Sequence, residues 1–235
     1  MMKTNNLTII AEIGLNHNGN FDLNYELIRQ AKFSGADYVK FQFGWREKED
    51  ELNYLDENRI RKLYSWAEYF EIKILFSVFN KKSYDLLKNF KPNSIKIASR
   101  TLINDPDLVE EIIEAHENVI ISLGMWNKEQ NQLPFDSKNI SYLWCESKYP
   151  CTPWDMKNFP KQFLHTTYSG YSDHTIGIET CLLAICRGAR IIEKHFTLDK
   201  SDVTIRDHTL SATPEEFLQL SRLGGDIFKK LKIGV

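Results

Sequence analysis

The sequence lacks an excess of charge of either sign and lacks any long apolar run. Its 30 Lys and Arg residues face 32 Asp and Glu residues, so no general electrostatic field would attract nucleic acid or an anionic membrane. The short apolar run near the N-terminus is broken by Glu12, which predicts neither a signal peptide nor a membrane span. We therefore expect a cytoplasmic protein without nucleic-acid or membrane partners.

Cysteine is scarce and irregularly placed. Its four positions form no CxxC pair: Cys145, Cys151, Cys181 and Cys186. This spacing disfavours a disulfide framework and favours reduced thiols with structural roles. Cys181 and Cys186 fall in an apolar helical segment, where cysteine usually serves as a small core residue.

Low-complexity linkers, internal repeats and a G-x-S-x-G turn are missing as well. Their absence favours a single domain and gives no sign of a nucleophilic serine triad. The apolar fraction of 42% and charged fraction of 26% are ordinary for a folded protein that buries a core.

What the sequence does contain is an alternation of two patterns. Short apolar, β-branched runs predict eight strands at residues 7–13, 38–43, 72–78, 94–98, 119–123, 140–145, 168–172 and 190–196. Apolar residues at helical spacing predict helices at 24–33, 60–70, 83–90, 108–116, 178–187 and 215–231. The alternation predicts an α/β fold, a single (β/α)8 TIM barrel covering residues 1–235.

Residues typical of helix ends support this pattern. Asp22 precedes the first helix and Gly35 follows it, while Asp105-Pro106 opens another. The run 213–216, Thr-Pro-Glu-Glu, is a clear helix start. Segment 127–139 is polar, contains Pro134 and has no apolar stripe, so we expect a degenerate helix there.

Two lysines lie inside apolar strands, on a period that points them into the barrel. Burying the ammonium of Lys40 or Lys96 is costly unless it is paired. Each lysine taken alone could neutralise an internal carboxylate such as Glu12. Two in different strands favour an anionic ligand, a phosphate or a carboxylate.

Two histidines end consecutive strands at the face where barrel enzymes place their chemistry. His174 and His195 can converge on one divalent cation, with carboxylates or water completing its shell. Either could instead be a hydrogen-bonded structural residue, but the flanking Asp173 and Lys194 and the matched depth of the pair favour the metal. Asp207 lies over the same mouth and would bind the ion or hydroxyl groups. His17 and His208 are interpreted as loop histidines.

Small hydroxyl residues end four further segments. They are Ser99, Ser122, Ser147 and Ser172, which suit hydrogen bonds to phosphate oxygens or to a polyol.

Taken in order, these segments resemble the sialic acid (N-acetylneuraminate) synthase family, whose members condense phosphoenolpyruvate with an N-acetylated aldose. The most specific pieces are residues 11–19, 39–42, 96–99, 170–175 and 193–197, followed by Asp207-His208. The resemblance spans residues 11 to about 217. It implies a nonulosonic acid as product, release of phosphate, and a place in polysaccharide biosynthesis.

The resemblance also implies roles for individual residues. His174 and His195 would hold the metal, usually Mn²⁺ in this family. Phosphoenolpyruvate would be held by the lysines and serines Lys40, Lys96, Ser77, Ser99, Ser122, Ser147 and Ser172, where Ser77 replaces a family threonine. The sugar and the reacting atoms would lie among Glu12, Gln42, Tyr149 and Asp207, so that Glu12, Lys40, Lys96 and Asp207 are the expected catalytic residues.

Two departures from the family pattern matter. The family usually carries Ser-Gly followed by an acid, whereas this chain has Ser99-Arg100-Thr101, and a threonine is no proton acceptor near neutral pH. Glu12, Glu146, Asp173 or the substrate would have to take over, or the activity is weakened. Arg100 either supplies a charge beside the site or lies at the surface.

The second departure is at the C-terminus. Family members commonly continue into an antifreeze-like domain that covers a partner's active site, and we expect the short form without it. A homodimer or a separate capping protein then remains open as a partner.

Three functions remain in competition. The first is a phosphoenolpyruvate-dependent nonulosonate synthase acting on an N-acetylmannosamine-like sugar. The second, motivated by Thr101, is a metal-dependent sugar-acid aldolase or lyase on the same barrel. The third is a catalytically weakened protein that binds sugar or phosphoenolpyruvate.

Overall fold

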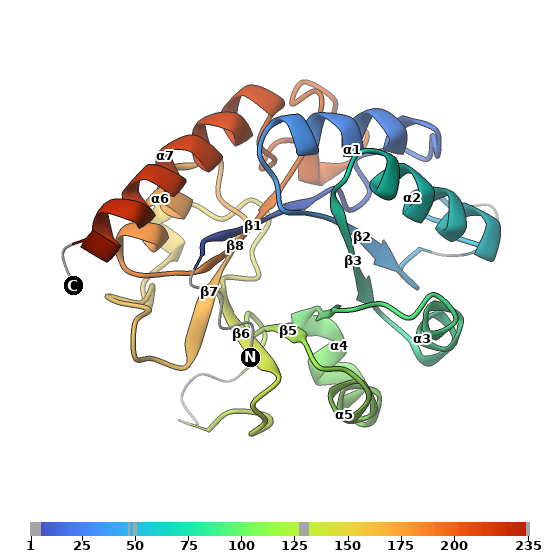
Figure 1. The fold of residues 1–235 in the computed structure, drawn as a ribbon, viewed down its shortest axis with the longest axis horizontal. Helices are drawn as coiled ribbons and strands as arrows, with labels where there is room; N and C mark the ends of the chain where they lie inside the picture. Colours follow the sequence, from blue (N-terminus) through green and yellow to red (C-terminus); the bar gives the residue numbers. More distant parts are fainter. Residues whose placement is uncertain (1–5, 47, 49–50, 127–131, 234–235) are drawn as a thin grey trace.

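The computed structural model describes residues 6–46, 48, 51–126 and 132–233. Eight parallel strands form a closed barrel in chain order, with helices around the outside (Figure 1). The strands are β1 Thr8–Glu12, β2 Tyr38–Phe43, β3 Lys73–Val78, β4 Ile95–Ile97, β5 Val119–Ser122, β6 Ile140–Cys145, β7 Tyr168–Asp173 and β8 Ile191–His195. The predicted fold class and all eight strands are confirmed.

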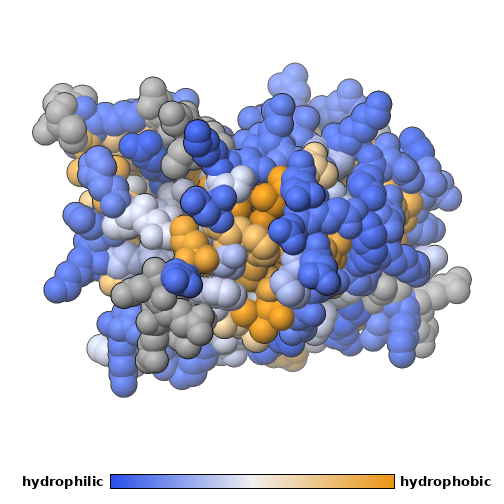
Figure 2. Space-filling model, turned by 90° about the horizontal axis from the view of Figure 1, so that it is seen from below, coloured by the Kyte–Doolittle hydropathy of each residue, from blue (hydrophilic) through white to orange (hydrophobic). Residues whose placement is uncertain are grey.

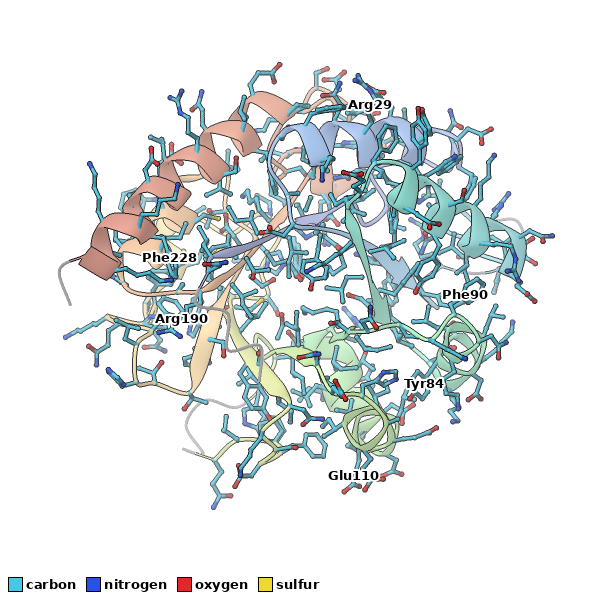
Figure 3. The ribbon with its side chains drawn as sticks, in the orientation of Figure 1. Arg29, Tyr84, Phe90, Glu110, Arg190 and Phe228 are labelled. Carbon is cyan, nitrogen blue, oxygen red and sulfur yellow. The ribbon has the colours of Figure 1, made fainter. Side chains whose placement is uncertain are left out.

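The helices follow the strands as βα units require. They are α1 Leu23–Phe33, α2 Glu57–Tyr69, α3 Lys81–Lys88, α4 Ser99–Asn104, α5 Pro106–Ala115, α6 Glu179–Cys186 and α7 Pro214–Ile233. Charged side chains such as Arg29 and Glu110 point away from the ring of helices (Figure 3). No helix among the described residues is long and apolar enough to cross a membrane.

Local capping explains several helix starts. The Asp105 side chain accepts a hydrogen bond from the amide of Leu108, and Thr213 and Glu216 bond reciprocally to each other's amides, the pairing of a capping box. Gly35 follows α1 with a φ of +86°, a conformation that glycine adopts without strain. Asp22 is the N-cap of α1 but makes no side-chain cap bond.

The barrel wall is thinner after β5 and β6. Residues 127–131 of the segment expected to be degenerate lie outside the described residues, and 132–139 form no helix. The long connection after β6 contains only the short 3-10 turn η2, Pro153–Asp155. Figure 2, which views the side of β5, β6 and α5, shows apolar side chains gathered in a band across this face.

Helix α4 is the element that the sequence pattern missed. It follows β4 directly and begins at Ser99, so the Ser99-Arg100-Thr101 run is helical. The hydroxyl of Thr101 donates to the Val78 carbonyl at 3.0 Å, and the side chain is buried. Six residues are too few to show a helical stripe.

Two apolar layers surround the strands because successive side chains point to opposite faces. Outward-facing residues pack against the helices in one large core. Inward-facing residues form a small plug inside the barrel: Ile10, Tyr38, Leu75, Ile120, Leu143 and Ile191. Two positions further along each strand, the inward side chains become polar, and they lie at the C-terminal end of the barrel.

Gly170 on β7 lies against the next strand with no space for a side chain. A Cβ atom there would stand 1.9 Å from the Ile191 carbonyl oxygen. We predict that Gly170→Ala lowers the free energy of unfolding by about 3 kcal/mol or more, because backbone must move. The measurement is urea unfolding followed by circular dichroism.

Gly225 on α7 gives the matched control. A Cβ there would meet nothing within 4 Å, so Gly225→Ala should raise the free energy of unfolding by about 1 kcal/mol through helix propensity. Equal effects of the two substitutions would contradict the close packing inferred for β7 and β8.

Candidate active site

One cavity of about 610 Å³ opens at the C-terminal ends of the strands, within the size range of small-molecule sites. Every site residue predicted from the sequence lines it: Glu12, Lys40, Gln42, Ser77, Lys96, Ser99, Ser122, Ser147, Tyr149, Ser172, His174, His195 and Asp207. They come from all eight strands or the segments that follow them. The barrel thus brings together residues that are up to 195 positions apart in the chain.

The floor of the cavity is a buried group of two ammonium and two carboxylate side chains. Lys40 lies 3.1 Å from Glu12 and 3.1 Å from Glu193, and donates to Ser77 at 3.0 Å. Lys96 lies 3.9 Å from Glu193 and donates to Ser122 at 2.7 Å and to the Ile97 carbonyl. We call Glu12, Lys40, Lys96 and Glu193 the floor group.

Glu193 is a site residue that sequence reasoning missed. It faces inward between the two lysines and accepts a hydrogen bond from Ser172 at 2.8 Å. One signal in the sequence could have identified it, because it lies two residues after the inward-facing Ile191 and two before His195. The neutralisation of Lys40 by a carboxylate, which was the alternative to a ligand, is observed, and Glu193 shares it with Glu12.

The floor group shifts its own pKa values in opposite directions. Burial alone would raise the pKa of Glu193, but Lys40 and Lys96 lower it to about 2. Burial lowers the pKa of Lys96 to about 8. Burial and the neighbouring Glu193 raise the pKa of Glu12 against the pull of Lys40. Glu193 is therefore a fixed anion, whereas Glu12 is the better proton acceptor.

Both predicted metal ligands face the same side of the cavity. The ring centroids of His174 and His195 are 5.4 Å apart. The Nδ1 atom of His174 lies 2.8 Å from the Glu146 carbonyl, and a bond from Nδ1–H to a carbonyl leaves Nε2 to bind a metal. The buried Nδ1 of His195 has no hydrogen-bond partner among the described residues.

These observations fit a cation site with two imidazole ligands. Asp207 is the nearest described carboxylate to the pair, with Oδ2 at 4.0 Å from Nδ1 of His195. The described residues contain no cluster of three or more possible protein ligands, so water or substrate oxygens would have to complete the shell. Burial lowers the pKa of His195, which favours the neutral form that binds metal.

Aromatic and basic groups frame the histidines. The ring centroid of Tyr149 lies 4.1 Å from that of His174, and the Arg206 guanidinium lies over the Tyr149 ring, 4.6 Å from its centroid. Arg206 also lies 3.4 Å from Asp207. Tyr149 therefore contacts both the histidine pair and an arginine of the cavity lining.

Asp173 and Lys194 do not line the cavity. The expectation from the sequence that these two residues support the metal site is wrong. Their side chains point out of the barrel and form a fully buried ion pair at 2.7 Å. Asp173 also accepts hydrogen bonds from Tyr171 and Thr175. Alternation along β7 and β8 explains this, because neighbours of inward-facing residues must face outward.

The structure reduces the number of residues that could replace the acid missing at Thr101. Of the three candidates Glu12, Glu146 and Asp173, only Glu12 lines the cavity. Glu146 contributes its backbone carbonyl to His174 instead.

His17 and His208, interpreted as loop histidines, form contacts between loop residues. His17 contacts Asn53 at 3.3 Å, and His208 bonds Thr197 and Asn18 at 2.7 Å each. Neither lines the cavity.

The structural interpretation of the cysteines holds only in part. Cys181 is buried as expected, whereas Cys186 is exposed. Cys145 lines the cavity, with its sulfur 3.6 Å from Nδ1 of His174. Its place at the inward-facing end of β6 could have been found from strand alternation.

Comparison with known proteins assigns this site to a family. The model of the NeuB family matches residues 47–232. The chain belongs to the NeuB family. An uncharacterized protein of Methanocaldococcus jannaschii is 37% identical over 90% of this chain and 68% of its own length. The N,N'-diacetyllegionaminic acid synthase of Campylobacter jejuni is 32% identical over 97% of this chain and 78% of its own.

A solved structure agrees with this assignment. The N-acetylneuraminic acid synthetase of Leptospira borgpetersenii, in complex with citrate, superimposes with a TM-score of 0.82 at 29% identity. The match covers 97% of this chain and 85% of that one. Other relatives are named as synthases of pseudaminic acid and of N-acetylneuraminate 9-phosphate.

The outward ion pair behind the histidines yields a stability prediction. Lys194→Met leaves the buried Asp173 carboxylate unpaired, so we expect the free energy of unfolding to fall by about 3–5 kcal/mol. Urea unfolding of purified protein measures it. The control is Arg61→Met, which removes an exposed pair with Glu57 at 2.6 Å and should cost about 1 kcal/mol or less. Similar losses in both variants would refute a structural role for the buried pair.

Proposed function

We propose that this NeuB-family protein condenses phosphoenolpyruvate with an N-acetylated aldose, N-acetylmannosamine or a close relative, to give a nonulosonic acid and phosphate. The observation that carries the proposal is one cavity with two buried lysines at its floor and two converging histidines on its wall. The lysine pair can hold an anionic donor, and the histidine pair can orient a carbonyl. Family membership supports the class of product.

The floor group suits phosphoenolpyruvate because the carboxylates do not occupy all the hydrogen-bond donors of its two ammonium groups. Lys40 and Lys96 share the two carboxylates Glu12 and Glu193. An arriving phosphate or carboxylate would compete for the same ammonium hydrogens, and such charge-assisted contacts are strong in a site that excludes water. Hydroxyl donors surround this charge at Ser77, Ser99, Ser122, Ser147 and Ser172.

A divalent metal, most often Mn²⁺ in this family, would be held by His174 and His195. When bound, such a cation polarises a carbonyl oxygen as a Lewis acid. The chain's own part is to present the two rings in fixed positions, with His174 anchored through the Glu146 carbonyl.

The acceptor sugar would lie between the histidines and Glu12. Gln42 donates to Glu12 at 2.9 Å and so holds this carboxylate toward the cavity. The raised pKa of Glu12 suits a group that accepts a proton near neutral pH. Tyr149 and Asp207 would bind sugar hydroxyls.

The reaction balances with these roles. C3 of phosphoenolpyruvate attacks C1 of the open-chain aldehyde and forms the new carbon–carbon bond. Water adds to C2 and loses two protons as the bond between C2 and the phosphate oxygen breaks and the C2 carbonyl forms. Glu12 is the candidate acceptor of the first proton and would pass it to the former aldehyde oxygen, which becomes a hydroxyl, while the second proton leaves with the phosphate. Lys40 and Lys96 stabilise the charge that gathers on the departing phosphate.

Phosphate release tests the proposal directly. With Mn²⁺, phosphoenolpyruvate and a panel of N-acetylated aldoses, we expect one phosphate released for each nonulosonic acid formed. His174→Ala and His195→Ala should each lower kcat at least about 100-fold while the fold is retained, because the acceptor loses its orienting site. The assay is colorimetric phosphate detection with mass spectrometry of the product.

Two results would favour the competing functions. Pyruvate formed from a nonulosonic acid without phosphate would identify a lyase. Calorimetric binding of phosphoenolpyruvate with no turnover of any sugar, at full metal occupancy, would identify a binding protein.

The pKa of Lys96 leads to a pH dependence. Lys96, with its pKa lowered to about 8, is protonated below that pH and loses its charge as pH rises through it. We expect the dissociation constant of phosphoenolpyruvate to rise up to about tenfold per pH unit above pH 8, as the binding cation disappears. Isothermal titration calorimetry between pH 6.5 and 9.5 measures this.

The control is Lys96→Met. This variant should bind phosphoenolpyruvate more weakly at every pH and lose the rise above pH 8. Lys40 has its pKa raised by Glu12 and Glu193 despite burial, so it stays protonated over the range. An unchanged pH profile in Lys96→Met would show that another group titrates.

A further inference from the structure

Three arginines stand at the mouth of the cavity, above the floor group. Arg46, Arg100 and Arg206 all line the cavity and are exposed to solvent. Arg46 lies in the loop after β2, Arg100 in helix α4 directly after β4, and Arg206 in the segment after β8. The rim therefore carries basic residues both near β2 and β4 and near β8, in a protein whose overall charge is only −2.

Arg100 packs on Trp45, the residue that precedes Arg46. The Arg100 guanidinium lies 5.2 Å from the ring centroid of Trp45, which packs against Phe79 at 5.5 Å. Arg46 follows Trp45 in the chain. Trp45, Phe79, Arg46 and Arg100 all line the cavity, and we call them the rim cluster.

The backbone of the rim cluster is fixed from below. The side-chain amide of the buried Asn53 donates to the carbonyls of Gln42 and Trp45 at 2.6 and 3.1 Å. The backbone N–H of Asn53 donates to the carbonyl of Arg46 at 3.2 Å. His17 in turn contacts the Asn53 side chain. Arg46 has a φ of +53°, an uncommon value for a residue other than glycine. The loop is therefore held in a defined shape at the place where it presents Arg46.

The positive charge of the rim cluster is not neutralised by the described part of the chain. Arg46 and Arg100 form no ion pair with any described residue, whereas Arg206 lies 3.4 Å from Asp207. In the floor group, by contrast, the two lysines face two carboxylates. Within the described part of the chain, Arg46 and Arg100 are thus cavity-lining cations with no carboxylate partner, on the side of β2 and β4.

The barrel places the rim cluster across the mouth from the histidines. In a closed barrel ordered β1 to β8, β4 stands opposite β8 and β3 opposite β7. His174 and His195 stand at the ends of β7 and β8. A chain-like ligand that has its carbonyl at the histidines and spans the mouth would place its other end near β2–β4.

We propose that the acceptor sugar carries an anionic group, a phosphate or a carboxylate, at the end remote from its aldehyde, and that Arg46 and Arg100 bind this group. The inference rests on the proposed function, since that function puts the aldehyde at the histidines. Arginine suits the task because its planar group pairs with phosphate or carboxylate through two hydrogen bonds. Trp45 holds the Arg100 side chain by stacking, which reduces the entropy it loses on binding.

The first test compares acceptors. Turnover is followed as consumption of phosphoenolpyruvate with N-acetylmannosamine, its 6-phosphate and the corresponding 6-carboxylate. We expect kcat/KM to be at least about tenfold higher for an anionic acceptor than for the neutral sugar, because hydrogen bonds between charged groups are the stronger class. The two anionic acceptors separate phosphate from carboxylate. A preference for the neutral sugar would overturn the inference while leaving the proposed function intact.

The second test uses variants of the rim. Arg46→Ala and Arg100→Ala should each raise KM for the anionic acceptor about tenfold, with little change in KM for phosphoenolpyruvate or in turnover of the neutral sugar. Added salt should weaken the preference, because the rim is exposed. Arg61→Ala, at an exposed site on α2, is the control. An equal rise in KM for phosphoenolpyruvate would assign the arginines to the donor instead and overturn the inference.

A binding measurement keeps the two proposals distinguishable. Calorimetry with N-acetylmannosamine 6-phosphate and no phosphoenolpyruvate needs no turnover. Tighter binding than for N-acetylmannosamine, lost in Arg100→Ala and kept in Arg61→Ala, would support the rim site even if the condensation itself failed. Equal binding of the two sugars by all three proteins would refute it.

Discussion

The structure depends on the burial of two ammonium groups inside a β-barrel. A charge in a poorly polarisable interior must be paired, or it loses its proton. Lys40 is paired with Glu12 and Glu193, whereas Lys96 is only 3.9 Å from Glu193 and has its pKa lowered to about 8. The two lysines therefore differ in their electrostatic environment although both are buried in the barrel. One is a permanent cation, and the other gains stability when an anion arrives.

The cavity follows from this constraint and from the period of the strands. Below the floor group, inward-facing positions are apolar and close the barrel. At the floor they are charged, and above it they include His195 and Gln42. Along these strands, an inward-facing apolar residue is therefore followed, at the next inward-facing position, by a residue that lines the cavity. A change of register by one residue would turn these side chains toward the helices.

Most of the fold was predictable because the strands are short apolar runs with strong punctuation. Predicted and observed strand bounds differ by at most two residues, as at 7–13 against Thr8–Glu12. The cavity residues were predictable because barrel sites gather at strand ends, and the family resemblance assigned their roles. Helix α4 was missed because six residues show no periodicity.

Other features could not be found without three-dimensional contacts. Lys40 is paired with two carboxylates, Glu12 on the neighbouring strand β1 and Glu193 on β8, and Glu193 had been seen only as part of a motif. Asp173 and Lys194 adjoin the histidines in sequence but face the opposite side of the sheet. The basic rim required the loop after β2 and the helix after β4 to be placed side by side, which no local pattern encodes.

The Asp173–Lys194 pair has one more consequence, for the two histidines that follow these residues in the chain. It ties the ends of β7 and β8 together behind the sheet, immediately beside His174 and His195. The separation of the two rings is therefore set by the sheet and not by mobile loops. The entropy lost in ordering two imidazoles is lost when the barrel folds, so the cation proposed for this site would meet two ligands already in place.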